Sequence, residues 1–281
     1  MNILLTDIIT SIPPLVASAL AEDIGTGDIS AELIPAERRA SAYVITREDC
    51  VVCGQAYFNE VFTQLGGVNV HWLVAEGDRV NANTRLVELT GPARVLLTGE
   101  RCALNFLQTL SGTATTTAHF VDLVKDAAFK LLDTRKTIPG LRLAQKYAVA
   151  IGGGSNHRIG LYDAFLIKEN HITACGSITQ AIAQARLAGP NKPIEVEVET
   201  LLQLQEAIAA KADRVMLDNF TADNIREAIK LAQGQCEIEI SGNLNKNTIP
   251  ALLNTSVDYI SSGALTKHLQ AIDLSMRLTL I

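Results

Sequence analysis

The chain has 281 residues and a formal net charge of −6, with 48% hydrophobic and 19% charged residues. An acidic balance argues against nucleic acid as a partner, because nucleic-acid binding requires a broad basic surface. No run of about 20 uncharged apolar residues occurs, so we expect no membrane span. Five scattered cysteines and an N-terminus without a basic region favour a cytoplasmic protein over a secreted one.

The first hundred residues contain three runs typical of strands, at 44–54, 68–80 and 84–93, which predict a separate small α/β or β-rich domain. Within the first run, Cys50 and Cys53 form a C-x-x-C pattern. Positions three apart in a strand point to opposite faces, so we expect no redox or metal pair there. A helical stretch follows at 94–124, and we expect it to be broken near Ser111–Gly112.

The segment 74–93 resembles half of the hammerhead of biotinyl and lipoyl carriers, in which a lysine at a hairpin tip carries the cofactor. No lysine occurs between Met1 and Arg101. We therefore interpret this segment as scaffold.

From Leu131 onward, short apolar runs alternate with amphipathic helical stretches. This order favours consecutive βαβ units around a parallel sheet. Six units are fewer than the eight of a complete barrel, so the sequence predicts an open, incomplete α/β barrel. The strand-like runs are 130–134, 164–168, 194–199, 214–218, 236–241 and 258–262, and the helical stretches are 141–150, 177–188, 201–210, 224–232 and 247–254.

A polar group follows or ends each strand-like run. In a parallel barrel the carboxyl ends of the strands meet at one mouth, where barrel enzymes keep their reacting groups. The last two runs end in Ser-Gly sequences that resemble phosphate-binding loops. The six groups are Arg135, Lys168, Glu197, Asp218, Ser241 and Ser262.

Positive charge is concentrated between Leu131 and His171, although the chain as a whole is acidic. A cluster of cations on an acidic protein predicts a small, highly charged anionic ligand. The Gly-rich sequence 152–158 lacks the lysine of a phosphate-binding P-loop, and either ends a helix or lets His157 and Arg158 approach a ligand. The cations are Arg135, Lys136, Arg142, Lys146, Arg158 and Lys168, with His157 and His171 beside them.

Three side chains leave more than one interpretation open. Lys168 fits either a Schiff-base nucleophile or an anion clamp, and the neighbouring cations favour the clamp. Glu197 and Asp218 fit Mg²⁺ ligands, partners of a developing positive charge, or partners of the neighbouring cations.

Several motifs together resemble the quinolinate phosphoribosyltransferase family, over essentially the whole chain and in the family's order. The stretch from DTRKT to KENH is the most specific, and no position where the family keeps a functional residue departs from its pattern. The motifs are EDIGTGDIS, LLTGERCALNFLQTLSG, LLDTRKTIPGLR, GGGSNHRIGLYDAFLIKENHI, IEVEVE, MLDNF, SGN and SSGALTKH.

The resemblance implies an N-terminal α/β sandwich over 1–107, joined by 270–281, and an open α/β barrel over 108–269. It implies a homodimer that joins quinolinate to phosphoribosyl pyrophosphate and releases pyrophosphate and CO₂. The product is nicotinate mononucleotide, for NAD biosynthesis.

The family's functional residues carry over by motif. Lys168, Glu197 and Asp218 would be catalytic, and Arg101 would reach the site from the neighbouring subunit. Glu197 and Asp218 would face the ribose and a Mg²⁺ ion held mainly through pyrophosphate. The full set of implied substrate-binding residues is Arg101, Thr134, Arg135, Lys136, His157, Arg158, Lys168, Glu197, Asp218, Ser241, Gly242, Asn243, Ser262, Gly263 and Ala264.

Three other interpretations stay open at this point. A related phosphoribosyltransferase-like paralogue from molybdate-transport gene clusters shares the fold, but we expect it to depart from the motifs kept here. A Schiff-base aldolase would use Lys168 as its nucleophile. A non-catalytic carrier would need a modifiable lysine in the hairpin, where none occurs.

Overall fold

The structure is a computed structural model that describes residues 2–241, 248–253 and 255–281. The chain forms two compact units. One unit comprises 120–137 and 154–264, and the other comprises 2–119, 138–153 and 265–281. In the described part of the chain, no helix combines the length and apolarity needed to cross a membrane.

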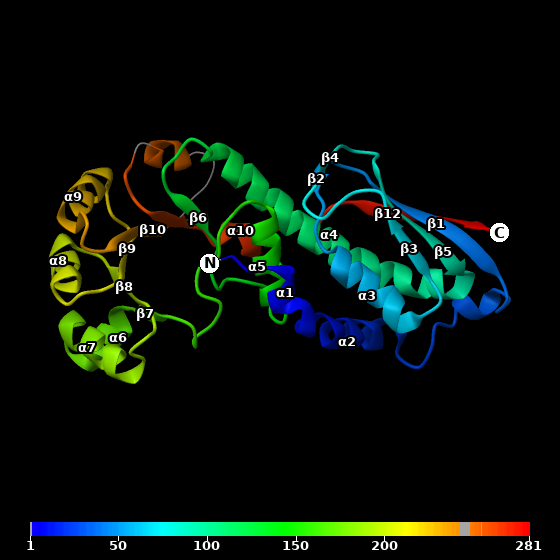
Figure 1. Cartoon of the computed structure of the whole chain (residues 1–281), viewed down its shortest axis with the longest axis horizontal. Helices are drawn as coiled ribbons and strands as arrows, with labels where there is room; N and C mark the ends of the chain where they lie inside the picture. The colour runs from blue at the N-terminus through cyan, green and yellow to red at the C-terminus, as the bar shows by residue number, and fades with distance from the viewer. Residues whose placement is uncertain (1, 242–247, 254) are drawn as a thin grey trace. The chain divides into compact units, whose positions relative to one another are not determined.

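The first unit, here called the barrel unit, is built on a six-stranded sheet in the order β6-β11-β10-β9-β8-β7 (Figure 1). Every neighbouring pair of strands in this sheet is parallel. The strands are β6 (Lys130–Leu132), β7 (Phe165–Ile167), β8 (Ile194–Val198), β9 (Arg214–Asp218), β10 (Glu237–Ser241) and β11 (Tyr259–Ser261). Each lies within one of the six runs predicted from the sequence.

Helices follow the strands of the barrel unit and cover one side of its sheet (Figure 1). β8 shows why: Ile194, Val196 and Val198 are buried on one face, and the alternating Glu195 and Glu197 point to the other. The apolar face packs against helices, which leaves the acidic face for the barrel interior. The helices are α6 (Glu169–Cys175), α7 (Ile178–Ala188), α8 (Leu201–Ala209), α9 (Ala222–Ala232) and η3 (Ile249–Leu252), and α10 (Ala264–Lys267) begins at the last residue of the unit and continues into the other unit.

The barrel is open, as the sequence predicts. β6 and β7 are the two edges of the sheet and do not pair with each other. On the free edge of β6, Leu132 forms an isolated parallel bridge with Ser155. Ser155 donates its N–H to Leu131 O at 2.8 Å, and Asp133 donates its N–H to Ser155 O at 3.0 Å. The segment after Gly154 therefore extends the sheet by a short stretch of extended backbone.

The second unit, here called the sandwich unit, contains a four-stranded sheet in the order β12-β1-β5-β3, antiparallel throughout. β12 belongs to the C-terminal segment and pairs with β1 from Ala40↔Leu280 to Thr46↔Leu274. Two short strands, β2 and β4, form a separate antiparallel pair. The strands are β1 (Arg39–Thr46), β2 (Cys50–Val51), β3 (Asn69–Trp72), β4 (Arg79–Val80), β5 (Arg85–Pro92) and β12 (Leu274–Leu280).

The helices of the sandwich unit supply much of its buried apolar surface. Tyr57, Phe58 and Phe62 of α3 are almost fully buried, and Phe58 packs edge-on against Trp72 with ring centroids 5.2 Å apart. The helices are α1 (Leu5–Ile8), η1 (Ile9–Ser11), α2 (Ile12–Ile24), η2 (Ala31–Leu33), α3 (Gln55–Leu65), α4 (Ala93–Leu123) and α5 (Arg142–Ile151). Sequence patterns did not predict α2 or α3.

The expected break at Ser111–Gly112 is wrong, because α4 runs unbroken from Ala93 to Leu123. Gly112 is needed for another reason: a Cβ atom placed there would lie 2.2 Å from the backbone oxygen of Gln270. The glycine permits close packing of a neighbouring backbone against an intact helix.

The compact units and the domain ranges predicted from the sequence divide the chain at different points. The predicted ranges 1–107 and 108–269 meet inside α4, whereas the compact units divide after His119. Both divisions fall within α4, and the compact units place α4 up to His119 with the sandwich unit. Residues 138–153, which contain α5, also belong to that unit.

Candidate functional site

A pocket of about 170 Å³ lies within the barrel unit. It is smaller than the roughly 300–1,000 Å³ of sites for larger ligands, which suits a compact anion. It brings together eight residues that the sequence predicted, with three others, Leu166, Met216 and Ser261. The predicted residues that line it are Thr134, Arg135, Lys136, His157, Arg158, Lys168, Glu197 and Ser241.

The parallel register explains why residues far apart in sequence share this pocket. Glu197 of β8 is level with Met216 of β9, and Ser241 of β10 is level with Ser261 of β11. Paired residues of parallel strands point to the same face. These four side chains therefore face the barrel interior near the carboxyl ends of the strands, on two successive levels of the sheet.

Four cations line the pocket: Arg135, Lys136, Arg158 and Lys168. Burial, and then the positive charge of Arg135, lower the pKa of Arg158. Arg158 is held in place by a hydrogen bond from its guanidinium to Ala164 O at 3.1 Å. Like charges crowded in this way create a strongly positive potential that an anionic ligand would relieve.

Lys168 is ion-paired with Glu197 through its Nζ atom. The side chain of Lys168 is 42% exposed and that of Glu197 is 16% exposed. At the other end of Lys168, its backbone N–H donates to His171 Nδ1 at 3.0 Å, so His171 caps α6. An ammonium group paired with a carboxylate favours the anion-clamp interpretation, since a Schiff-base nucleophile needs the neutral amine.

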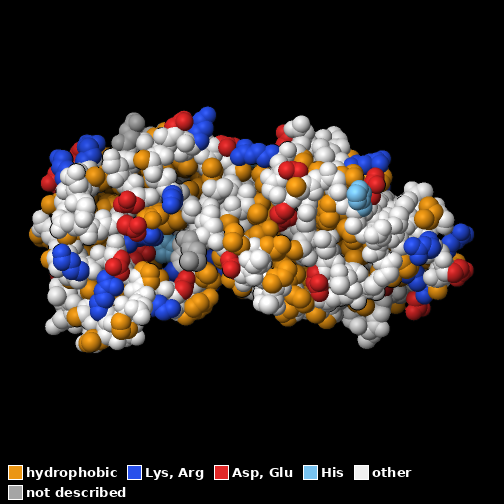
Figure 2. Space-filling model, in the orientation of Figure 1, with side chains coloured by type: hydrophobic (Ala, Val, Ile, Leu, Met, Phe, Trp, Pro, Cys, Tyr) orange, Lys and Arg blue, Asp and Glu red, His pale blue; other side chains and the backbone are white. Residues whose placement is uncertain are grey.

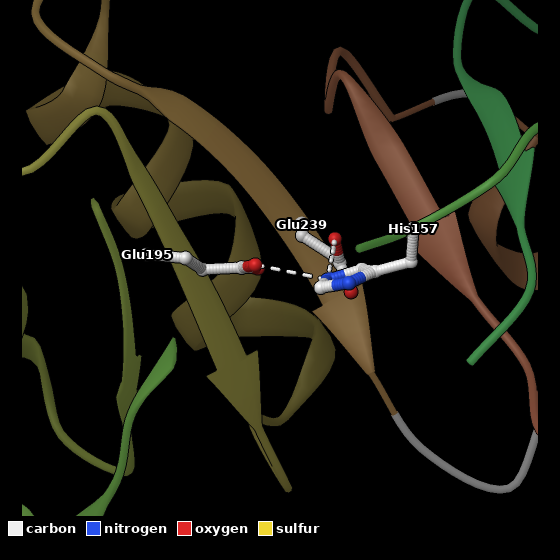
Figure 3. A group of neighbouring side chains, drawn as sticks. All are labelled: His157, Glu195 and Glu239. Carbon is white, nitrogen blue, oxygen red and sulfur yellow. Dashed lines mark ion pairs between the residues drawn. The ribbon is translucent and has the colours of Figure 1, made fainter. Parts of the chain in front are cut away.

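Two buried glutamates that the sequence did not single out surround His157 (Figure 3). Its Nε2 lies 2.9 Å from Glu195 Oε2 and 3.4 Å from Glu239 Oε2. Burial lowers the pKa of His157, but the contacts with the two carboxylates outweigh burial and raise it. The N–H of Arg158 donates to His157 Nδ1 at 2.8 Å. This hydrogen bond occupies the lone pair of Nδ1 and so opposes protonation of that nitrogen.

Arg214 places a further positive charge beside the cluster of His157, Glu195 and Glu239. It lies 3.3 Å from Glu239 and 3.0 Å from Glu237, and its guanidinium covers the ring of Tyr259 at 3.8 Å. Burial raises the pKa of Glu195, as does the charge of Glu239. The period-two glutamates of IEVEVE and CEIEIS were the available signal, because such glutamates must share a face with the site.

The cluster of His157, Glu195 and Glu239 has the composition of a metal site but not the protonation. Among the described residues, His157, Glu195 and Glu239 form the one group of three whose ligand atoms lie within 4.8 Å of one another. The bond from Arg158 N–H to Nδ1 leaves the proton of a neutral ring on Nε2, the atom that faces the glutamates. A protonated Nε2 cannot ligate a metal, so the arrangement is that of a histidine held by carboxylates.

The sequence placed Mg²⁺ elsewhere, at Glu197 and Asp218. Asp218 is half-buried at the end of β9, level with the pocket residue Ser241. Its carboxylate accepts a hydrogen bond from the Asn219 side chain at 3.0 Å. Mg²⁺ is usually held by one or two carboxylates plus substrate phosphates, so these two residues fit an ion that arrives with pyrophosphate.

The other predicted residues lie outside the pocket lining. Ser262 is buried and Ala264 donates its N–H to Ser262 Oγ at 3.2 Å. Gly263 faces Lys136: a Cβ atom there would lie 2.8 Å from Lys136 Cδ. Gly242 and Asn243 fall outside the described residues. Arg101 is exposed on α4, in the sandwich unit.

The surface of the barrel unit is mixed in charge near this site. In Figure 2, at the left, acidic and basic side chains lie close together around a hollow, with a histidine among them. On the face shown, the basic side chains alternate with acidic ones and form no broad basic surface.

Comparison with known protein families gives two matches. Residues 28–111 match the family model described as quinolinate phosphoribosyl transferase, N-terminal domain. Residues 113–277 match the model for the C-terminal domain of the same enzyme. Together the two matches cover nearly the whole chain.

Among curated relatives, the chain is 45% identical over 262 residues to a probable nicotinate-nucleotide pyrophosphorylase (carboxylating) of Bacillus subtilis, covering 92% of this chain and 90% of that protein. A protein of the same name from Synechocystis is 41% identical over 273 residues, covering 95% of this chain and 92% of that protein.

Among solved structures, the nicotinate-nucleotide pyrophosphorylase of Francisella tularensis is 52% identical with a TM-score of 0.94, over 99% of this chain and 98% of that one. The NadC structure from Streptococcus pyogenes is 41% identical with a TM-score of 0.93, over 100% of this chain and 99% of that one. The predicted fold class, an α/β sandwich with an open α/β barrel, is confirmed. With both domain models matched in order and relatives this similar along their whole length, the chain belongs to the quinolinate phosphoribosyltransferase family.

Proposed function

We propose that the chain transfers the phosphoribosyl group of phosphoribosyl pyrophosphate to quinolinate, with decarboxylation, in NAD biosynthesis. The products are nicotinate mononucleotide, pyrophosphate and CO₂. The pocket carries this proposal, because it brings Arg135, Lys136, Arg158 and Lys168 to one mouth of the barrel. Membership of the family supports the same reaction.

The cations suit the substrates. Quinolinate is a dicarboxylate and its partner carries a phosphate and a pyrophosphate, so several negative charges meet in one site. Arginine binds carboxylates and phosphates through paired hydrogen bonds, and lysine binds them as a point charge. We assign the carboxylates of quinolinate to Arg135, Arg158, Lys136, Lys168 and the adjacent His157, with Thr134 beside them.

The first chemical step forms a bond from the quinolinate nitrogen to C1 of the ribose. The bond from C1 to pyrophosphate breaks, and its electron pair leaves with pyrophosphate. The ribose then resembles an oxocarbenium ion, which nearby carboxylates stabilise. Glu197 and Asp218 are the carboxylates at the ends of β8 and β9 and take this role, and Lys168, paired with Glu197, neutralises the departing anion.

In the second step the bond from C2 to its carboxyl group breaks and CO₂ leaves. The electron pair stays on C2, beside the positively charged ring nitrogen, and C2 then takes up a proton. The cations around the ring bind the dicarboxylate more strongly than they bind the neutral CO₂ or the product. This difference favours release of both products from the site.

A Mg²⁺ ion, where bound, would supply positive charge to neutralise pyrophosphate. Glu197 and Asp218 are the side chains that would hold the ion, and most of its ligands would be phosphate oxygens. Ser241, Gly242, Asn243, Ser262, Gly263 and Ala264 would hold phosphate groups through their backbone and hydroxyl groups.

The proposed assembly is a homodimer in which Arg101 of each subunit completes the partner's site. The substrates are small molecules, and the proposed function requires neither nucleic acid nor a membrane. All five cysteines are free thiols, which suits a reducing compartment such as the cytoplasm.

The test is release of CO₂ from quinolinate labelled in its 2-carboxyl group, with and without phosphoribosyl pyrophosphate. We expect release only when both substrates are present, in step with pyrophosphate. Nicotinate, which lacks that carboxyl group, is the matched control. A cation cluster left without its carboxylate is costly, so we expect turnover of nicotinate to be lower by roughly a hundredfold or more. Comparable turnover of nicotinate would contradict the assignment.

A further inference from the structure

The cations of the pocket come from two separate stretches of chain. One stretch follows β6 and carries Arg135 and Lys136. The other enters along the free edge of β6 and carries His157 and Arg158. The two stretches bring like charges into one pocket, and burial and then the charge of Arg135 lower the pKa of Arg158. Something must hold them at the spacing that a small dianion requires.

Asp133 joins the two stretches. It comes directly after β6 and one position before Thr134 of the first stretch. Its Oδ1 accepts the backbone N–H of His157 at 2.9 Å, and its Oδ2 accepts the side-chain amide of Asn156 at 2.7 Å. Its own N–H donates to Ser155 O at 3.0 Å. One residue thus contacts three consecutive residues of the second stretch.

The burial of Asp133 makes these contacts costly to lose. Asp133 is fully buried, with 0% exposure, and Asn156 is 8% exposed. It does not line the pocket, so it has no direct route to the ligand. A buried carboxylate that accepts hydrogen bonds from two backbone or amide donors fixes their geometry, much as the outer partners of metal ligands fix the ligands.

The ring of His157 is fixed independently from the other side by Glu195 and Glu239. Its backbone is held by Asp133 and its ring by β8 and β10. The backbone of Arg158, the next residue, is fixed with it, because its N–H donates to His157 Nδ1. The second stretch is therefore anchored to three strands of the barrel.

We infer that Asp133 is a positioning residue for the anion pocket: it binds no substrate, and it holds His157 and Arg158 at the correct distance from Arg135 and Lys136. This inference rests on the proposed function, since it takes quinolinate as the dianion that bridges the two stretches.

The change in quinolinate affinity expected for Asp133→Asn is opposite in sign to the change expected from charge alone. Asp133→Asn removes a negative charge from beneath a pocket for anions, which by charge alone would tighten anion binding. If Asp133 acts by position, the same change weakens binding. Asparagine presents an amide to two donors and can accept from only one side, so one of the two hydrogen bonds is lost.

The experiment measures the dissociation constant of quinolinate by calorimetry, with the thermal unfolding midpoint of each protein. We expect Asp133→Asn to weaken quinolinate binding about tenfold or more. Asp133→Glu, which keeps the charge and misplaces the carboxylate, should also weaken it. The wild-type chain is measured first, and if it binds no quinolinate the proposed function fails, whatever the variants do.

Asp258→Asn is the matched control. Asp258 precedes the neighbouring strand β11, and its Oδ2 accepts the N–H of Ile238 at 2.8 Å. It holds backbone at the amino ends of the strands, away from the pocket. We expect Asp258→Asn to lower the unfolding midpoint and to leave the affinity of the folded protein unchanged.

Asn156→Ala serves if Asp133→Asn does not fold. It removes the contact to Asp133 Oδ2 and keeps the charge of Asp133. We expect the same weakening of quinolinate binding, to a smaller extent. Unchanged or tighter binding in the folded Asp133→Asn protein overturns the inference, and so does unchanged binding in Asn156→Ala when Asp133→Asn fails to fold.

Discussion

Lys168 shows how one side chain can belong to both the binding and the catalytic part of the site. It lines the pocket with the other cations and is paired with Glu197, one of the two carboxylates assigned to the ribose. Binding of pyrophosphate would compete for the ammonium group. Glu197 would then be released toward the developing positive charge at the moment when that charge appears.

We predict that Lys168→Arg retains partial activity, roughly 1–10% of the wild type, because the charge persists while the geometry changes. Lys168→Met should lose far more. The measurement is steady-state turnover of quinolinate by each protein. Lys192→Arg, at an exposed position in the same unit, is the control and should be unaffected. A covalent adduct trapped by borohydride would instead identify Lys168 as a Schiff-base nucleophile.

At this scale the sequence predicted the residues at the mouth and missed those beneath it. Arg135, Lys168 and Glu197 were predictable because the end of a strand-like run fixes their place in a parallel barrel. Asp133 was not, and Glu195 and Glu239 were marked only by their period-two spacing in two strand-like runs. Their roles depend on the register between strands and on burial by the segment after Gly154, and neither is encoded within one run of residues.

Among the elements, α4 departs most from its expected form. Glycine within a helix usually suggests a break, because glycine destabilises helices by about 1 kcal/mol relative to alanine. Gly112 lies within an intact helix and allows the backbone at Gln270 to approach closely. Gly112 therefore does not break the helix but allows close contact between two segments far apart in sequence.

We predict that Gly112→Ala destabilises the protein by about 2 kcal/mol or more, although alanine is the better helix former. The added Cβ atom would lie 2.2 Å from the Gln270 oxygen, so the backbone must move. Urea unfolding measures the change. Thr116→Ala, at a half-buried position of the same helix, should change stability by less than about 1 kcal/mol. A more stable Gly112→Ala protein would mean that the two segments separate freely.

A second element, η2, depends on one carboxylate. Asp28 Oδ1 accepts the backbone N–H groups of Ser30 and Ala31 at 3.1 and 3.0 Å, and its Oδ2 accepts the Thr98 hydroxyl at 2.8 Å. These contacts connect the start of η2 to α4. The hydrogen bond from Ala31, then that from Thr98, lower the pKa of Asp28 below its usual 3.8.

We predict that Asp28→Asn lowers the free energy of unfolding at pH 7, because a neutral amide accepts the N–H groups of Ser30 and Ala31 less strongly than a carboxylate does. The pKa of Asp28 is lower in the folded than in the unfolded chain, so its carboxylate stabilises the fold above about pH 3.8. That contribution is lost as the pH falls through the folded value. The difference between the two proteins should therefore shrink below pH 3.8, and Asp126→Asn, at an exposed position, should show none.

The elements of the barrel were largely predictable, and the full sheet of the sandwich was not. Each barrel strand carries an apolar face and a polar end, and each is followed by an amphipathic helix, so local pattern and global fold agree. The sandwich unit takes β12 from the far end of the chain and pairs it with β1. Local patterns cannot reveal a pairing across more than 200 positions. The buried residues of α2 and α3 do recur at helical spacing, so these two helices were predictable from the sequence.

At the scale of the whole molecule, the pocket of the barrel unit lacks one of its side chains if Arg101 binds the substrate. The pocket is lined by residues of the barrel unit alone. Arg101 is exposed on α4 and belongs to the sandwich unit. Two subunits about a twofold axis can exchange such a residue, so that each supplies the arginine of the other's barrel.

This arrangement predicts complementation between two inactive proteins. In a mixed dimer of Arg101→Ala and Asp218→Ala chains, one barrel has an intact Asp218 and receives an intact Arg101, while the other site carries both defects. Random reassortment makes about half of the dimers mixed, and each has one working site of two, so roughly a quarter of wild-type activity should return in the whole mixture and about half in isolated mixed dimers. The chains are mixed by denaturation and refolding, or by co-expression with two affinity tags, and the mixed dimers are isolated before the assay. Asp218→Ala mixed with Glu197→Ala is the control: both defects lie in the barrel unit, so no mixed dimer has an intact site and no activity should return. If isolated mixed dimers of Arg101→Ala and Asp218→Ala are no more active than the separate variants, Arg101 acts within its own subunit or outside the site, because only an exchanged arginine can restore one barrel of the pair.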